Sequence, residues 1–352
     1  MKVLFLPKYT IKGASSRLRT YQYLPYYKES GLDITVSPFF SNEYLQQVYD
    51  KKSHNLWLSL KSFVRRLAVL FTVFRYDRIV IEKELFPYFP AVFEILLNSF
   101  GVKYIVDYDD AIWHNYDESP RKWVRILLSK KINYVMRNAH AVVVGNQYIY
   151  DKAQQAGAKR IYNIPTVIDI DKYKQKEKPQ KDKFVIGWIG SPITEKYLPL
   201  LKSVFIKLSK EFQIELHWLG AQRGLGLGEI EKILTWSSEK EAALIKEFDV
   251  GIMPLQDNIW ERGKCGYKLI QYMGCGIPVV GTPIGVNKEI IQEGINGFQA
   301  ENEQEWHEKL KFIILSKDTE VWKNMGQNGR KIVEEKYTLQ ANQGKWLEII
   351  KK

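Results

Sequence analysis

The stretch from Gly263 to Gly285 reads GKCGYKLIQYMGCGIPVVGTPIG. Residues 267–273 place apolar side chains at helical spacing, and residues 277–280 read as a short buried strand. Glycines separate the two elements and stop the expected helix. The stretch therefore predicts a loop–helix–strand unit of an α/β fold.

The loop ahead of this helix has the features of an anion site. Its glycines, Gly263 and Gly266, precede a helix start whose free backbone N–H groups carry a partial positive charge. Lys264 and Lys268 add full charges, and a diphosphate suits such a place. The same spacing also fits an ordinary loop–helix–strand unit with solvated lysines, so both interpretations stay open.

The stretch resembles the donor-binding signature of the GT-B glycosyltransferases of family 4, the retaining "group 1" proteins. Residues 272–280, YMGCGIPVV, match the family's A-M-A-x-G-x-P-V-V, and Gly266 matches its loop glycine. The family's two glutamates fall on Gly263 and Gln271. The chain is similar to a branch that reads K-x-x-x-K-L-x-[EQ]-Y-M, which has lysines at 264 and 268.

The resemblance implies roles for these residues. Gln271 can hydrogen-bond the ribose hydroxyls, as the family's second glutamate does. Gly263 cannot replace the first glutamate, which touches the donor sugar or its phosphate in the family. We expect the side chains of Lys264 and Lys268 and the backbone N–H groups of Gly266 and Tyr267 to bind the diphosphate.

Length and composition narrow the class of protein. The 352 residues suffice for two domains, and 45% of them are hydrophobic. No apolar stretch is long enough to span a membrane, and MKVLFLPKYT at the N-terminus reads as a first strand, not a signal peptide. The two cysteines, Cys265 and Cys275, indicate neither a disulfide framework nor a zinc site, and they fit a cytoplasmic protein.

The net charge of +12 is uneven along the chain. Residues 1–165 hold 24 Lys and Arg against 14 Asp and Glu, or 24 − 14 = +10, and the remainder holds 28 − 26 = +2. We therefore expect an anionic partner on the N-terminal side, but no nucleic acid, because no recognition module is present. Apolar–basic helices expected at about 53–74 and 121–137 either pack on the core, with their charges solvated, or contact the inner face of an anionic membrane.

The first strand, residues 2–6, leads into the loop GASSRLR, residues 13–19. We expect Ser15 or Ser16 to cap the following helix, which leaves Arg17 and Arg19 free to reach into a cleft. A glycine-rich loop at this place lines the interdomain cleft in the family. A capped helix with solvated arginines is the alternative.

Three carboxylates follow the strand expected at 103–106, namely Asp107, Asp109 and Asp110. Ligands of open α/β sheets bind beyond the carboxyl ends of strands, so we expect this cluster to face the donor sugar or the acceptor. The pattern resembles the D-x-D-D-A of the same family branch. The resemblance makes Asp109, Asp110 and Arg17 catalytic candidates beside Lys264 and Lys268.

Other polar positions complete the expected site. Gly145 and Asn146 follow the strand at 141–144 and are expected on the cleft side. A metal site at D-x-D, as in GT-A enzymes, is disfavoured, since GT-B proteins typically need no metal. In the second half of the chain, the loop after the strand at 184–189 supplies the remaining donor-site candidates: Gly190, Ser191, Thr194 and Lys196.

A nicotinamide oxidoreductase is also disfavoured, because Glu229 stands where G-x-G-x-x-G needs its last glycine, so no cofactor is expected. We predict an α/β fold of GT-B type, with two Rossmann-like domains facing each other across a cleft. Residues 1–168 are expected to form the acceptor-side domain, residues 169–183 a linker and residues 184–335 the nucleotide-sugar domain. Residues 336–352 are expected to form a C-terminal helix that crosses back to the N-terminal domain.

The implied function is metal-independent, retaining transfer of a hexose from a nucleotide-diphosphate sugar to a glycan, lipid-linked or small-molecule acceptor in cell-surface polysaccharide or glycolipid synthesis. An epimerase or hydrolase on the same scaffold and a non-catalytic sugar-nucleotide-binding protein are the alternatives.

Overall fold

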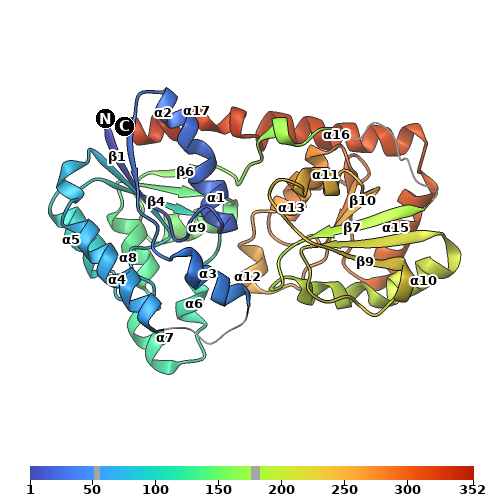
Figure 1. The fold of residues 1–352 in the computed structure, drawn as a ribbon, viewed down its shortest axis with the longest axis horizontal. Coiled ribbons are helices and arrows are strands. Elements are labelled where there is room, and N and C mark those ends of the chain that lie inside the picture. Colours follow the sequence, from blue (N-terminus) through green and yellow to red (C-terminus); the bar gives the residue numbers. More distant parts are fainter. Residues whose placement is uncertain (51–55, 176–182) are drawn as a thin grey trace. The chain divides into compact units, whose positions relative to one another are not determined.

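The computed structural model describes residues 1–50, 56–175 and 183–352, which form two compact units. The first unit comprises Met1–Thr166, Gly263–Cys265 and Asn342–Lys352, and the second comprises Val167–Arg262 and Gly266–Ala341. Both chain ends therefore lie in the first unit (Figure 1). Residues 53–55 of the expected helix and residues 176–182 of the expected linker lie outside the described residues.

The described part of the first unit contains a six-stranded parallel sheet in the order β2-β1-β3-β4-β5-β6. The inner strands of this sheet are mostly apolar and buried, as strands covered on both faces require, whereas the edge strands, which read DITV and IYN, are partly exposed. Their bounds are β1 Lys2–Leu6, β2 Asp33–Val36, β3 Arg78–Glu82, β4 Tyr104–Tyr108, β5 Ala141–Val144 and β6 Ile161–Asn163.

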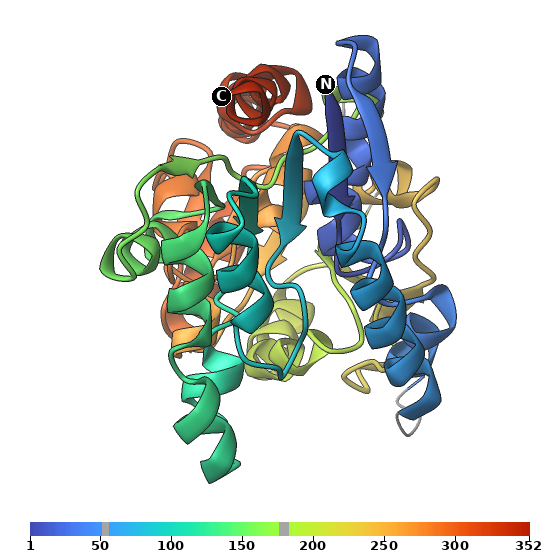
Figure 2. The same ribbon diagram turned by 90° about the vertical axis from the view of Figure 1, so that its left-hand side faces the viewer.

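Helices connect these strands by crossovers. They are α1 Ala14–Arg19, α2 Leu24–Glu29, α3 Asn42–Tyr49, α4 Leu56–Leu70, α5 Val92–Ser99, α6 His114–Asp117, α7 Lys122–Leu128, α8 Lys131–Asn138 and α9 Gln147–Gln155, with short turns η1 Tyr21–Tyr23 and η2 Val73–Arg75. Figure 2 views the unit from the side of α4, α5, α7 and α8. From Asn342 onwards, α17 (Leu339–Lys351) also belongs to this unit, where Trp346 packs on Tyr23.

The prediction of one helix over 121–137 is wrong, because the chain forms α7 and α8 with a break between them. The break follows from burial of Lys131 at the start of α8. Its ammonium donates to Glu84 and to the carbonyl of Phe86, and its side chain is 1% exposed. This buried ion pair fixes where the second helix begins.

The second unit contains another six-stranded parallel sheet among its described residues, in the order β12-β11-β10-β7-β8-β9. Its strands are β7 Phe184–Ile189, β8 Ile214–Leu219, β9 Glu231–Leu234, β10 Val250–Met253, β11 Val279–Gly281 and β12 Gly297–Gln299. Its helices and short turns are η3 Ile170–Lys172, η4 Glu195–Leu201, α10 Lys202–Glu211, η5 Gly228–Ile230, α11 Glu241–Ile245, α12 Ile259–Arg262, α13 Tyr267–Gly274, α14 Asn287–Ile290, α15 Glu303–Leu315 and α16 Glu320–Lys336.

Both sheets reverse their winding direction at one point, between β1 and β3 in the first unit and between β7 and β10 in the second. The predicted α/β class is confirmed, and in such sheets ligands bind beyond the carboxyl ends of the strands at the reversal point. Within the described ranges, no helix is both long and apolar enough to cross a bilayer.

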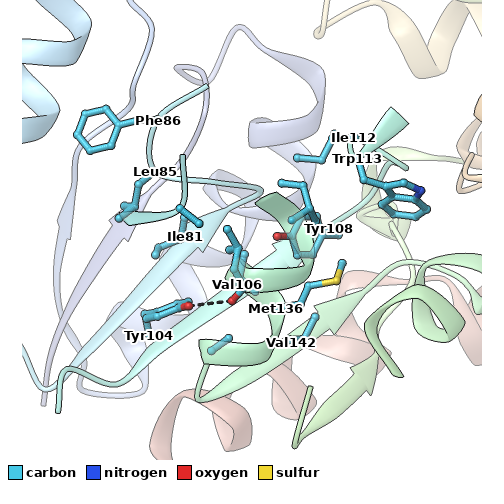
Figure 3. Packing of buried hydrophobic residues seen from close by; sticks show 14 of the residues in the cluster. Ile81, Leu85, Phe86, Tyr104, Val106, Tyr108, Ile112, Trp113, Met136 and Val142 are labelled. Carbon is cyan, nitrogen blue, oxygen red and sulfur yellow. Dashed lines mark hydrogen bonds between the residues drawn. The ribbon is translucent and has the colours of Figure 1, made fainter. Parts of the chain in front are cut away.

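The core of the first unit packs around β3, β4 and β5 (Figure 3). Side chains from the strands, among them Ile81, Val106 and Val142, meet Met136 of α8. One polar atom inside this core is satisfied, because the Tyr104 hydroxyl donates to the carbonyl of Val135 at 2.8 Å.

Removal of that hydroxyl provides a test of the packing. We expect Tyr104→Phe to lower the free energy of unfolding of the first unit by about 1–2 kcal/mol, because a buried carbonyl loses its partner. Tyr134→Phe, on the exposed side of α8, should change it by less than about 0.5 kcal/mol. Urea denaturation of both variants measures the difference, and equal effects would contradict the assignment.

Candidate functional site

The first unit gathers charged side chains at the carboxyl ends of β1, β3 and β4, which are neighbours in the sheet. Glu82 and Lys83 come from the end of β3, and Asp107 and Asp109 from the end of β4. A carboxylate oxygen of Glu82 accepts from the Ser16 hydroxyl at 2.6 Å and from the Lys8 backbone N–H at 3.0 Å. We call Ser15, Ser16, Glu82, Lys83 and Asp109 the first-unit cluster.

The serines do not cap α1 as predicted. The residue at the N-cap is Gly13, and no side chain caps the helix there. The hydroxyls point to carboxylates instead, with Ser15 donating to Asp109 and Ser16 to Glu82. This part of the prediction is wrong because α1 begins at Ala14, so that both serines lie inside its first turn and not at the N-cap position.

Arg19 and Asp107 are also placed differently from the prediction. The guanidinium makes two hydrogen bonds to the carboxylate, one of them 2.9 Å from Nε, and donates to the carbonyl of Ile164 at 2.8 Å. Both side chains are nearly inaccessible, at 1% and 3% exposure. Arg19 is therefore not free to reach a ligand, and Asp107 is occupied by a structural ion pair.

Lys83 is a residue that the sequence prediction missed. Its backbone has a φ of +70°, a conformation that residues other than glycine rarely adopt. Its ammonium lies 2.9 Å from Asp109 Oδ1. Burial raises the pKa of Asp109, but the charge of Lys83 and the hydrogen bond from Ser15 outweigh it and lower the pKa to about 2. The charged run Glu82-Lys83-Glu84 at the end of an apolar strand is the sequence feature that could have indicated Lys83 as a site residue.

Glu82 is the second missed residue of the first-unit cluster. Its other oxygen, Oε1, is buried and has no hydrogen-bond partner within the described ranges. Burial raises the pKa of this carboxyl above its usual value. A buried acceptor without a partner is costly, so a polar ligand or water at this edge of the sheet has a group to bind.

The segment Gly263–Cys265 is held by the first unit. Asn146, which caps α9, donates to the carbonyls of Gly263 and Lys264 at 2.9 and 3.0 Å, and Cys265 Sγ lies 2.8 Å from the carbonyl of Asp109. A Cβ on Gly145 would lie 2.5 Å from that sulfur. Gly145 and Asn146, predicted to line a cleft, thus bind this segment.

Gly263, which aligns with the first glutamate of the motif that the sequence resembles, has no room for a side chain. A Cβ at this position would lie 2.4 Å from the Cβ of Ala111, so no side chain fits without movement of the chain. Lys264 follows with a side chain that is 31% exposed and lies 3.8 Å from Asp110, which is a loose ion pair. Lys264 and Asp110 are thus brought together, and both remain accessible to solvent.

In the second unit, α13 is anchored at the reversal point of the sheet. The Tyr272 hydroxyl accepts from the N–H of Ile189 at 2.9 Å and donates to the carbonyl of Ile252 at 3.3 Å, which joins the helix to β7 and β10. Gly266 precedes the helix with φ of +63°, and no side chain caps its N-terminus. The last turn of α13 is therefore fixed beside the carboxyl end of β7.

Lys268 of α13 and the loop after β7 both lie beside Trp188 of β7. The Lys268 ammonium lies 4.3 Å from the ring centroid of Trp188, and a Cβ on Gly190 would lie 2.3 Å from the same ring and 2.7 Å from Thr194 Oγ1. The Thr194 hydroxyl also accepts from the Ser191 N–H at 3.1 Å. Four predicted donor-site residues thus lie around one tryptophan, which we call the Trp188 site.

Two predicted donor residues lie elsewhere. Lys196 is exposed, with its ammonium 4.9 Å from the Tyr197 ring. Gln271 is 2% exposed, and its amide donates to the Tyr173 hydroxyl at 2.9 Å and to Glu241 at 2.7 Å. Both donor hydrogens are therefore used inside the unit, and a ribose hydroxyl could bind Gln271 only through its amide oxygen.

Glu261 of α12 is a further residue that the prediction did not include. It is 3% exposed and receives a hydrogen bond from Tyr197, while its Oε2 is buried without a hydrogen-bond partner in the described part of the chain. It precedes the glycine at the family's glutamate position by two residues. A carboxylate of this kind can accept hydrogen bonds from sugar hydroxyls.

A cavity of about 590 Å³ opens at the carboxyl ends of β10 and β11. None of the predicted donor residues lines it, and its charged lining is mostly acidic: Asp257, Glu301, Glu303 and Lys288. That balance does not suit a diphosphate. In the described ranges, His, Cys, Asp and Glu residues form no group of three that could hold a metal ion.

The sequence of the second unit is similar to that of known glycosyl transferases. Residues 183–315 match the family model for glycosyl transferases group 1. N-acetyl-alpha-D-glucosaminyl L-malate synthase from Bacillus anthracis is 35% identical over 77 residues, or 22% of this chain and 20% of that protein. The match thus spans about a fifth of the curated relative's length.

Solved structures resemble the whole chain. Sucrose-phosphate synthase from Thermosynechococcus elongatus matches with a TM-score of 0.72 at 12% identity, over 100% of this chain and 98% of that one. Anabaena HepE in complex with UDP matches with a TM-score of 0.72 at 16% identity, over 100% of both chains. At these identities the similarity shows the fold, and the predicted GT-B class is confirmed.

The buried ion pair of Arg19 and Asp107 gives a prediction on stability. Arg19→Met should lower the free energy of unfolding by about 3–5 kcal/mol, because it leaves Asp107 buried and uncompensated. Arg19→Met with Asp107→Leu should recover most of that loss. Denaturant unfolding followed by circular dichroism measures both, and a double variant as unstable as the single one would contradict a simple ion pair.

The lowered pKa of Asp109 gives a prediction on pH. Its folded pKa of about 2 lies below the usual value of 3.8, so its stabilisation is complete above pH 4 and is lost as the pH falls towards 2. Asp109→Asn should therefore cost about 2 kcal/mol near neutral pH, and the difference from the wild type should shrink below pH 4. Urea unfolding at several pH values tests this, and a constant difference down to pH 2 would refute it.

Proposed function

We propose that this protein is a retaining glycosyltransferase that moves a hexose from a nucleotide-diphosphate sugar to a glycan, lipid-linked or small-molecule acceptor, in family 4 and without a metal ion. The observation that carries the proposal is the Trp188 site, where Lys268 and the Gly190 loop meet at the reversal point of the second sheet. This site lies inside the segment that matches the glycosyl transferases group 1 model.

Cleavage of the bond between the sugar and the diphosphate requires fixed positive charge around the departing diphosphate. Lys268 and the positive dipole end of α13, whose N-terminus no side chain caps, supply charge that needs no reorganisation during the reaction. Lys264, two residues before Gly266 and only loosely paired, adds a second cation to the same stretch of chain. Departure of the diphosphate leaves an oxocarbenium-like sugar that the acceptor oxygen attacks on the same face.

The first-unit cluster is our candidate for the sugar and acceptor hydroxyls. Asp109 stays ionised because its pKa is low, and it is held by Lys83 and Ser15, so it accepts hydrogen bonds without moving. Asp110, which is accessible, and Arg17, which is half-buried, flank it in our proposal. We place the reaction in cell-surface polysaccharide or glycolipid synthesis, on the cytoplasmic side of the membrane.

The base of the donor is the first unknown to resolve. HepE binds UDP in its crystal structure, and we therefore propose a uridine diphosphate sugar as the first donor to test. A thermal-shift screen of UDP, GDP, ADP and dTDP should give one nucleotide with a clearly larger stabilisation. Turnover of the matching sugar nucleotides, with and without acceptors, separates a transferase from an epimerase or hydrolase. Binding without turnover of any donor would favour a non-catalytic protein.

Two substitutions test the roles of the lysines. Lys268→Ala and Lys264→Ala should each lower turnover at least about 10²-fold, since each removes one charge that stabilises the departing diphosphate. Lys331→Ala, on the exposed face of α16, is the matched control and should keep full activity. Initial rates at saturating donor measure the effect. Donor turnover that survives both changes would discard the assignment.

A further inference from the structure

Helix α4 has an unusual distribution of side chains. Its inward side carries Arg66, 1% exposed, which donates to the carbonyls of Pro7 and Ser37, and Ser62, which is also buried. Its outward side is apolar, with Val64 60% and Leu56 81% exposed. A helix on a water-soluble surface normally shows the reverse pattern.

The apolar exposure continues beyond α4. Phe71 follows the helix at 80% exposure, and Phe74 of η2 packs edge-on against Phe100, the residue after α5, at 6.2 Å between ring centroids. We define the outer apolar surface as the exposed apolar residues of these elements and of α7: Leu56, Trp57, Leu60, Val64, Leu67, Phe71, Phe74, Val92, Ile95, Leu96, Phe100, Trp123, Ile126 and Leu127. Figure 2 faces this side of the first unit.

The charges around this surface have one sign. Across the described helices α4, α5 and α7, the sole acidic residue is Glu94, which is buried and accepts from the N–H of Leu85. Exposed cations stand between the apolar residues, among them Lys61 on α4 and Lys122 on α7. The charged side chains that these helices expose to water are therefore all positive.

We propose that the outer apolar surface docks on an anionic lipid bilayer. Apolar side chains mixed with cations and without carboxylates match the interface of such a bilayer, where aromatic and aliphatic groups enter the acyl boundary and lysines face lipid phosphates. An apolar patch of this extent on a protein surface needs a partner. A protein partner is less well matched, because a surface with cations alone has no carboxylates to pair with a mixed rim.

Vesicle binding of the full chain tests the proposal. Cosedimentation should show strong binding to vesicles of phosphatidylcholine with 30% phosphatidylglycerol and at least about tenfold weaker binding to pure phosphatidylcholine. Leu60→Gln with Val64→Gln, and separately Lys61→Glu with Lys122→Glu, should each weaken binding to the anionic vesicles at least about tenfold. None of these side chains belongs to the Trp188 site or the first-unit cluster.

Matched controls come from the second unit. Leu315→Gln with Val321→Gln replaces two similarly exposed apolar residues, and Lys202→Glu with Lys210→Glu replaces two exposed lysines, and neither pair should change vesicle binding. Equal loss in the controls, or equal binding to neutral vesicles, would overturn the proposal. So would self-association that Leu60→Gln with Val64→Gln abolishes, since the surface would then join two copies of the chain. Nucleotide binding by the same variants is measured in parallel, so a failed donor site cannot be mistaken for failed docking.

Discussion

The hydroxyl of Tyr272 is the contact on which the second unit's site depends. It bonds to the backbone of β7 and of β10, the two strands between which the sheet reverses direction, and so it fixes the helix that follows Gly266. The ring needs a glycine opposite, since a Cβ on Gly251 would lie 2.2 Å from it. Once α13 is fixed, Lys268 lies over Trp188, and Gly190 leaves space beside that ring.

The two units use their cations differently. In the first unit, Arg19 and Lys83 are each bound to a carboxylate at the carboxyl edge of the sheet, so their charge holds the edge together. In the second unit, Lys268 faces an aromatic ring, whose interaction with a cation is weaker than that of a buried carboxylate. The two contacts differ in kind, because a carboxylate neutralises the cation beside it and an aromatic ring does not.

The sequence predicted the buried strands well and the polar contacts poorly. Strands such as 141–144 and 184–189 were predicted to the residue, because a parallel strand covered on both faces needs a continuous apolar run. Strand β9, which reads EKIL at an edge of its sheet, lacks that signal and was missed. The partners of Arg19 and Gln271 could not be predicted from the sequence, because they are far away along the chain. The partner of Arg19 is 88 positions away, and the two partners of Gln271 are 98 and 30 positions away.

The same limit applies to the positive charge of the first 165 residues, from which we predicted an anionic partner on the N-terminal side. Charge counts do not say which cations are neutralised, and the structure shows that the arginine and lysine nearest the strand ends are paired. Exposed cations such as Lys61 and Lys122 lie on the outer helices, where α4 turns Arg66 inward and its leucines and valines outward. A partner that recognises this surface must therefore accept apolar side chains and cations together.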